Sequence, residues 1–320
     1  MKRKWFMIAC ALYPLVLLAA CGGGSTGDGA EDLFVTIATG GQSGVYYPIG
    51  GALSKLYEEE LGATSSVQAT GASVENINLI DQGRAELAII MGDAATQAFE
   101  GIEPFQHKVD SFSAVASLYP NFVQVVTTVD SGIEKMEDLK GKHVGVGAPN
   151  SGVELNARAV LEAYGLSYDD FNADYLSYSE AIDGMKNGTV DAAFVTSGLP
   201  NSTVTDLSTA QEVNVIPIEG EAMEKLKEMH PYYVENVIPA GTYTNKEDIP
   251  TASIMNILVA SNELDEDTVF TLTKTLFDNI EVIHSSHNAA ADITKDSAKD
   301  SVPIPFHPGA EKYFNEAGIE

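Results

Sequence analysis

Two segments of this chain, 81–90 and 186–195, repeat one pattern: a helix end, a glycine turn, an acidic residue and a buried strand. Around each of them, short apolar runs end in glycine-rich turns and are followed by apolar residues at helical spacing, over 33–99 and 143–195. Strands and helices that alternate in this way indicate a mostly parallel sheet flanked by helices. The repetition therefore predicts an α/β fold with two lobes of like topology, completed by an amphipathic helix at 268–284.

Two longer extended runs, 112–128 and 253–260, do not follow this alternation. We interpret them as the passages of the chain from the first lobe to the second and back. This interpretation places lobe I at 33–119 and 252–320, and lobe II at 120–251. Two such connections form a hinge, and closure of lobes about a hinge is a known way to enclose a ligand.

The first twenty residues have the layout of a secretory signal. Three basic residues at positions 2–4 precede an uncharged stretch at 5–20. The apolar core of this stretch is shorter than the ~20 residues that a spanning helix needs. Residues 1–20 are therefore predicted to be a signal peptide, and the protein is expected to be extracytoplasmic.

The signal ends in Leu-Ala-Ala-Cys, which resembles a bacterial lipobox with Cys21 as the first mature residue. Cys21 would carry a diacylglyceryl group, whose two acyl chains are what stable anchoring requires. The alternative is an ordinary signal with an incidental cysteine. Residues 21–32 are mostly Gly, Ser, Thr, Ala and acid, which is typical of a flexible tether. Cys10 lies within the signal, so no disulfide is expected.

The chain is strongly acidic, with 46 Asp and Glu against 18 Lys and Arg and a formal net charge of -28. Such a surface repels nucleic acid and anionic lipid headgroups, so nucleic acid is excluded as a partner. No second apolar run is long enough to span a membrane. Contact with the membrane is therefore expected through the lipid on Cys21 and through docking to membrane subunits.

Three segments of the chain, 40–53, 69–76 and 151–158, carry a family resemblance. They read GGQSGVYYPIGGAL, ATGASVEN and SGVELNAR, and they resemble the TAXI family (TRAP-associated extracytoplasmic immunogenic proteins). These proteins are the solute-binding subunits of one branch of tripartite ATP-independent periplasmic transporters. The resemblance implies a two-lobed periplasmic-binding-protein fold of the second type. It also implies a ligand in the inter-lobe cleft, often glutamate or a related small carboxylate, and no catalysis.

The glycine-rich turns lie beyond the carboxyl ends of the strands, where open α/β sheets bind their ligands. A turn that opens a helix offers free backbone N–H groups and the positive end of the helix dipole, which suits a carboxylate without any lysine or arginine. Hydroxyl groups in the same turns supply further donors. The candidate ligand-binding residues are Gly41, Ser43, Gly44, Tyr46, Thr70, Ser73, Val74, Asn76, Asp93, Ser151, Gly152 and Ser197.

Each candidate also has a purely structural explanation. The serine and threonine hydroxyls could cap their helices, Tyr46 could pack in the core, Asn76 could face solvent and Asp93 could hold a neighbouring loop. Arg158 is a further candidate contact, because a bidentate guanidinium is the usual clamp for a carboxylate. Its place in the second turn of a helix is more typical of a salt bridge.

Motifs for an enzyme are not apparent. The segment 41–45 lacks the final glycine of a nucleophile elbow, and no glycine-rich loop ends in Lys-Ser or Lys-Thr. Among six histidines, only His284 and His287 have the spacing of metal ligands, and their position after an amphipathic helix favours a polar helix end. We therefore expect no catalysis, no cofactor and no metal site.

Together these features predict a lipid-anchored solute-binding protein that captures a glutamate-like amino acid, a keto acid or a dicarboxylate. The expected partners are the membrane subunits of a secondary-active TRAP-type transporter. Two alternatives remain: the binding protein of an ATP-driven importer, and a ligand-sensing lobe without a transporter. A third, an enzyme of the same fold such as a pyrimidine-precursor synthase, would show turnover.

Overall fold

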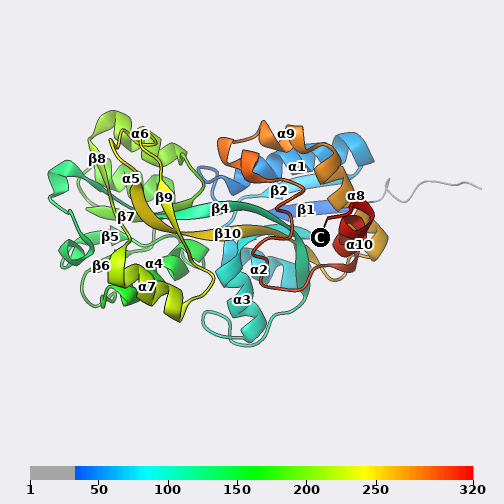
Figure 1. Ribbon diagram of the computed structural model, residues 1–320, viewed down its shortest axis with the longest axis horizontal. Helices are drawn as coiled ribbons and strands as arrows, with labels where there is room; N and C mark the ends of the chain where they lie inside the picture. Colours follow the sequence, from blue (N-terminus) through cyan, green and yellow to red (C-terminus); the bar gives the residue numbers. More distant parts are fainter. Residues whose placement is uncertain (1–32, 320) are drawn as a thin grey trace, which may run out of the picture.

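The computed structural model describes residues 33–319, and Figure 1 shows them as two lobes joined by two long strands. Lobe I combines the first and last parts of the chain. Its elements are β1 (Phe34–Ala38), α1 (Tyr46–Leu61), β2 (Thr64–Gln68), α2 (Ser73–Asp81), β3 (Leu87–Met91), α3 (Gly92–Glu100), α8 (Glu266–Asp278), α9 (Ile280–His284), the 3-10 helix η3 (Asn288–Asp292) and α10 (Pro308–Ala317).

Lobe II is built from the middle of the chain and repeats the alternation of strands and helices. Its elements are β5 (His143–Gly145), α4 (Gly152–Ala163), β6 (Asn172–Asp174), α5 (Tyr178–Lys186), β7 (Ala192–Ser197), α6 (Ser202–Ala210), β8 (Val213–Ile216), α7 (Gly220–Met229) and β9 (Val234–Ile238). Two 3-10 turns, η1 (Val129–Ser131) and η2 (Met136–Leu139), lead into it. The α/β fold expected from the sequence is confirmed.

The long strands β4 (Phe112–Thr128) and β10 (Ile249–Ser261) run through both lobes. They pair in antiparallel fashion, and their register shifts between Met255 and Ile257, near the middle of the pairing. The chain therefore passes between the lobes along the two extended runs, as the sequence analysis expected. Because both strands contribute to both lobes, the boundaries proposed at 119/120 and 251/252 stay a prediction.

The sheet is mixed and has the strand order β2-β1-β3-β10-β4-β7-β5-β6, with β8 beside β4 and β9 beside β10. Within lobe I, β1 pairs in parallel with β2 and β3, and within lobe II, β5 pairs in parallel with β6 and β7. The antiparallel pairings all involve β4 or β10. Each lobe thus has the parallel strands that were predicted, and the connecting strands add the antiparallel ones.

Two features differ from the sequence analysis. The expected helix at 268–284 is interrupted at Asn279, which has the non-helical angles φ -120° and ψ 30°. The Asn279 side-chain amide donates to the carbonyl of Thr275 at 3.0 Å, which satisfies one of the carbonyls left open where α8 ends. The elements α6, β8, α7 and β9 were not anticipated, because their apolar residues are sparse and their strands are short.

Helix α1 is fixed against the sheet by its apolar face, on which Ile49, Leu53 and Leu56 are buried. These positions recur at helical spacing, which is why the segment folds as a helix. The helix ends at Gly62, whose φ of 66° is the left-handed conformation favoured at a helix C-terminus. This packing holds the start of α1 close to the end of β1. Within residues 33–319, no helix is both long and apolar enough to cross a membrane.

Candidate functional site

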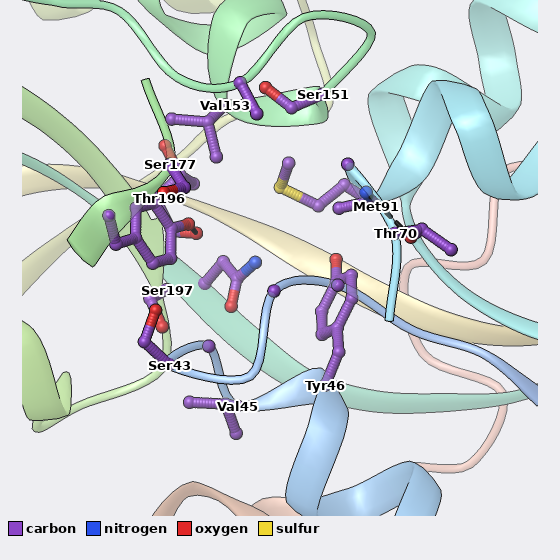
Figure 2. A pocket seen from close by; sticks show the side chains of 18 of the residues that line it. Ser43, Val45, Tyr46, Thr70, Met91, Ser151, Val153, Ser177, Thr196 and Ser197 are labelled. Atoms are coloured by element: carbon purple, nitrogen blue, oxygen red, sulfur yellow. Dashed lines mark hydrogen bonds between the residues drawn. The ribbon is translucent and has the colours of Figure 1, made fainter. Parts of the chain in front are cut away.

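A small cavity of about 80 Å³ lies between the two lobes. Figure 2 shows side chains from both lobes pointing into it. From lobe I and β4 the lining residues are Gly40, Gly41, Ser43, Gly44, Val45, Tyr46, Thr70, Gly71, Ala72, Met91, Tyr119 and Asn121. From lobe II they are Ala148, Ser151, Val153, Ser177, Tyr178, Thr196 and Ser197. A cavity far below the roughly 300–1,000 Å³ of pockets for drug-sized ligands suits a small solute.

The cavity wall is made by turns that follow parallel strands. The turns after β1, β2, β5 and β6 each open a helix, and the ends of β3 and β7 complete the wall. The carboxyl ends of parallel strands meet at one edge of a sheet, so each lobe presents its strand ends and helix starts to the other. The fold thereby directs the starts of α1, α2, α4 and α5 toward one small space.

The helix starts differ in their capping. In lobe II, Ser151 and Ser177 cap their own helices, since their hydroxyls accept the backbone N–H of residues three positions later at 3.2 and 3.4 Å. In lobe I, the residues before α1 and α2, Val45 and Ala72, make no side-chain cap. Ala72 has φ 76°, a strained conformation for a residue with a Cβ. The starts of α1 and α2 therefore have no side-chain cap, and at α2 the N–H of Glu75 is instead accepted by the carbonyl of Asn150 from lobe II at 3.2 Å.

Two residues of the wall, Tyr46 and Tyr119, are linked near the hinge through hydrogen bonds to Asn256 of β10. The Tyr46 hydroxyl donates to Asn256 Oδ1 at 2.5 Å, and Asn256 Nδ2 donates to the carbonyl of Tyr119 at 2.8 Å. Across the cavity, the Tyr178 hydroxyl donates to the carbonyl of Thr196 at 2.6 Å. These bonds hold the tyrosine rings of α1 and α5 in place against the crossing strands.

The wall is polar but neutral. Among the described residues, the side chains that line the cavity include no Asp, Glu, Lys or Arg. Burial raises the pKa of Tyr46, Tyr119 and Tyr178 above the usual value of a tyrosine, so their hydroxyls stay protonated. The cavity therefore offers hydroxyl, amide and backbone N–H groups to a solute, with no fixed charge.

Several buried polar atoms of the wall lack partners. Within residues 33–319, Tyr119 Oη, Asn121 Oδ1 and Thr196 Oγ1 are buried without a hydrogen bond. Buried polar groups in native proteins are almost always hydrogen-bonded to protein, water or ligand. Three such atoms around one cavity are what a site for a small polar molecule requires.

A model of the NMT1-like family matches residues 37–318 of the chain, which is nearly all that the structure describes. The chain belongs to the NMT1-like family. The matched range includes both lobes, both connecting strands and every residue of the cavity wall. The site of this NMT1-like protein thus lies within the part that defines the family.

Several solved structures share this fold. PhnD1 from Prochlorococcus marinus MIT 9301, in complex with methylphosphonate, is 12% identical with a TM-score of 0.57, over 89% of this chain and 98% of that one. The alkanesulfonate-binding protein SsuA from Xanthomonas axonopodis pv. citri, bound to MOPS, is 15% identical with a TM-score of 0.52, over 90% and 92%. A putative L-cystine ABC transporter protein from Listeria monocytogenes is 15% identical with a TM-score of 0.51, over 82% and 98%. At these identities the likeness shows the fold, that of type II periplasmic binding proteins.

In this NMT1-like protein, some of the ligand-binding residues that the sequence predicted line the cavity. The predicted residues that line it are Gly41, Ser43, Gly44, Tyr46, Thr70, Ser151 and Ser197. Figure 2 shows Tyr46 and Thr70 on one side and Ser43 and Ser197 on the other. Their role in binding a ligand stays a prediction. Thr70 also supports its own turn, because its hydroxyl accepts the N–H of Ala72 at 2.9 Å.

Three other predicted residues lie behind the wall on α2. The Asn76 amide is buried and donates to the carbonyls of Thr39 and Ile89 at 2.5 and 2.9 Å, which ties the ends of β1 and β3 together. The Ser73 hydroxyl accepts the N–H of Met91 at 3.1 Å. Val74 packs in an apolar core cluster. These contacts shape the wall without reaching the cavity.

Of the remaining predicted residues, Asp93 and Gly152 lie at the contact between the lobes, whereas Arg158 lies away from it. Asp93 is 1% exposed and accepts Asn156 Nδ2 at 2.5 Å, which joins α3 to α4 of the other lobe. Gly152 packs so closely on Ser73 that an added Cβ would lie 2.9 Å from its hydroxyl oxygen. The Arg158 side chain is 52% exposed and pairs with Glu154 at 2.6 Å, which is the salt bridge that its helix position favoured.

The sequence analysis did not propose several wall residues, among them Tyr119, Asn121, Ser177, Tyr178 and Thr196. Asn121 carries no distinctive signal, because its strand also holds Ser113, Ser117, Gln124, Thr127 and Thr128. Ser177 opens a helix in the same way as Ser151, with Glu three residues later. The two tyrosines carry no comparable local signal, since a tyrosine in such a position is usually core.

The histidine pair considered for metal binding has other contacts. His284 Nε2 lies 2.8 Å from the carbonyl of Ile293, and His287 Nδ1 accepts the N–H of Ala289 at 3.1 Å. In the part of the chain that the structure describes, no three His, Cys, Asp or Glu side chains are grouped as a metal site would need.

Proposed function

We propose that this protein is an extracytoplasmic solute-binding protein, which captures a small carboxylate between its lobes and delivers it to a membrane transporter. The observation that carries the proposal is the neutral cavity between the lobes, toward which uncapped helix starts and unpartnered hydroxyl groups are directed. Backbone N–H groups at a helix start bind anions well. The solutes named for two proteins of the same fold, methylphosphonate and an alkanesulfonate, are also small anions.

Capture requires that the lobes separate and close again. The proposed hinge lies where β4 and β10 cross between the lobes, near the register shift at Met255. Contacts that depend on closure include the Ser202 hydroxyl of α6, which donates to the carbonyl of Ser43 at 3.1 Å. A solute that bridges both walls adds bonds that only the closed form can make, so its binding favours closure.

The type of transporter has two candidates. The resemblance of 40–53, 69–76 and 151–158 to the TAXI family favours a secondary-active TRAP-type transporter. The shared fold with a putative cystine ABC transporter protein favours an ATP-driven importer. Uptake of labelled solute in cells with and without an ion gradient separates them. Loss of uptake when the gradient is collapsed at constant ATP supports the first candidate.

The proposed ligand contacts are tested with three variants. Ser43→Ala and Ser151→Ala each remove one cavity hydroxyl from opposite lobes, and Arg158→Ala removes a side chain outside the cavity. A hydrogen bond to a charged group contributes about 1.5–3 kcal/mol, so Ser43→Ala should bind roughly tenfold to a hundredfold more weakly in calorimetric titration. The Ser151 hydroxyl already accepts the N–H of Glu154 and can add only a neutral hydrogen bond of about 0.5–1.5 kcal/mol, so Ser151→Ala should bind roughly twofold to tenfold more weakly. Arg158→Ala should bind normally. If it alone abolishes binding, a guanidinium clamp replaces the proposed site.

Anchoring through Cys21 is a separate proposal, and Cys21 lies outside the described residues. It rests on the Leu-Ala-Ala-Cys segment and the glycine-rich stretch that follows. Mass spectrometry of the protein from native membranes should find an N-terminal diacylglyceryl cysteine. An unmodified protein that starts elsewhere contradicts the anchor.

A sensing role without a transporter is the remaining alternative. It predicts that the ligand-bound protein associates with a receptor ectodomain and that deleting the gene leaves uptake of the solute unchanged. The transport proposal predicts loss of that uptake.

A further inference from the structure

The helix starts around the cavity differ in charge as well as in capping. Helix α1 has no side-chain cap and no acidic residue in its first turn. Helices α4 and α5 are capped by Ser151 and Ser177 and carry Glu154 and Glu180 in their first turns. The positive end of α1 is therefore open to an anion, whereas those of α4 and α5 already face an acidic side chain.

Helix α2 is intermediate. Its start has no side-chain cap, but the Glu75 carboxylate accepts the N–H of Gly71 at 2.6 Å, which places a negative charge at this turn. Among the helix starts at the cavity that the structure describes, α1 alone combines open N–H groups with an absence of acid. The Gly44 N–H already donates to the carbonyl of Gly41 at 2.9 Å, so the favourable place for one anionic group is at the N–H groups of Val45 and Tyr46.

A second charge on the solute would find no partner. A second carboxylate facing lobe II would compete with the capping hydroxyls and would lie near Glu154 and Glu180. An ammonium group would lose its hydration against a wall that offers no carboxylate, which is costly for an unpaired charge. The buried Asp93 does not supply one, because its oxygens accept Ala94 N and Asn156 Nδ2 at 2.7 and 2.5 Å.

The part of the wall opposite α1 instead suits an uncharged polar group. Thr196 Oγ1 of lobe II is buried there without a partner, and Val153 adds apolar surface. On the connecting strand β4, Tyr119 Oη is a second buried hydroxyl without a partner. Each unpartnered hydroxyl can donate to a keto oxygen or exchange a bond with a hydroxyl. The small volume of about 80 Å³ limits the solute to a few carbon atoms.

We infer that the solute is a small monocarboxylate with an uncharged polar substituent, a 2-hydroxy or 2-oxo acid, whose carboxylate lies at the start of α1 and whose substituent faces Thr196. The inference rests on the proposed function, and it narrows the solute classes by excluding dicarboxylates and amino acids. It makes Thr196 a residue that determines specificity.

The test uses four-carbon acids that differ in one group, titrated calorimetrically into the full mature protein. We expect 2-hydroxybutyrate or 2-oxobutyrate to bind at least tenfold more tightly than 2-aminobutyrate, and butyrate to bind more tightly than succinate. If 2-aminobutyrate binds as tightly as 2-hydroxybutyrate and 2-oxobutyrate, or if succinate binds as tightly as butyrate, the inference is overturned while the proposed function stands. If no acid of the series, nor glutamate or 2-oxoglutarate, binds to folded protein, the proposed function fails with it.

The variant Thr196→Val tests the position of the substituent. It keeps the shape of the side chain and removes a hydroxyl that has no partner, so the protein should fold as before. We expect binding of the preferred 2-substituted acid to weaken about tenfold and binding of butyrate to stay within a factor of two. Equal losses for both acids, or no loss for either, would contradict the assigned role of Thr196.

Discussion

The hydroxyl of Tyr46 donates a 2.5 Å hydrogen bond to Asn256 Oδ1, which joins the start of α1 to the returning strand β10 across 210 residues of sequence. Both residues are buried, and Asn256 Nδ2 in turn donates a hydrogen bond to the carbonyl of Tyr119 in β4. The cavity wall and the hinge strands therefore share one hydrogen-bonded chain. A change at Tyr46 should affect both folding and binding.

Tyr46→Phe should lower the free energy of unfolding by about 1–3 kcal/mol, because it leaves the buried Asn256 oxygen without its donor. Solute affinity should fall as well, since Tyr46 lines the cavity. The matched control is Tyr47→Phe, next in the same helix, whose hydroxyl makes no hydrogen bond within residues 33–319. Urea denaturation and calorimetric titration measure the two effects. Equal behaviour of the two variants would show that the bond to Asn256 contributes nothing.

Gly152→Ala should prevent full closure of the lobes. Gly152 in α4 faces Ser73 and Met91 of lobe I, and the new methyl group would meet the Met91 side chain and lie 2.9 Å from Ser73 Oγ. Within each separate lobe the change should be tolerated, because alanine favours a helix more than glycine does. We expect at least tenfold weaker binding and a smaller solute-induced compaction in X-ray scattering, with little change in stability.

The control for this variant is Gly51→Ala in α1, where an added Cβ meets nothing within 4 Å. It should bind and compact like the parent. Wild-type scattering that is identical with and without a saturating solute would argue against a hinge altogether.

Asp93 should make the stability of the closed form depend on pH. Burial, opposed by bonds from Ala94 and Asn156, raises the pKa of Asp93 from its usual 3.8 to about 7. Because the folded protein holds this proton more tightly than the unfolded chain, Asp93 stabilises the fold at low pH. That stabilisation is lost as pH rises from about 4 through 7. The titratable groups that face it are the protonated tyrosines Tyr46, Tyr232 and Tyr233, and within residues 33–319 no cation offsets its charge.

The measurement is the free energy of unfolding of Asp93→Asn between pH 4 and 8. A shift of one pKa unit corresponds to ~1.4 kcal/mol. As pH rises across this range, the free energy of unfolding of Asp93→Asn should therefore increase relative to that of the parent by at most about 4 kcal/mol. The exposed Asp296→Asn serves as the control and should follow the parent curve. Parallel curves for the parent and Asp93→Asn would show that the pKa of Asp93 is the same in the folded and unfolded protein, which would contradict the effect of burial.

The local patterns of the sequence were sufficient for the elements nearest the site. The apolar residues at helical spacing within 33–99 predicted the helices of lobe I, among them α1, and the glycine turns after β1, β2 and β5 were expected at the cavity where they lie. Such turns can be read locally because glycine, serine and threonine have preferences that act within a few residues. The passage of 112–128 between lobes was also evident from its length.

What the sequence by itself determined was the α/β class, the two rounds of strands and helices and the turns that carry the hydroxyl groups. Only the tertiary structure decided which of those groups face one another. Asn76 and Asp93 were candidates alongside Ser43 in the sequence, yet they support the wall and the lobe contact while Ser43 lines the cavity. Tyr119, Tyr178 and Thr196 became wall residues because β4, α5 and β7 meet α1 across the cleft. These meetings join residues that are far apart in the sequence, and local preferences, which act within one helix or turn, do not specify them.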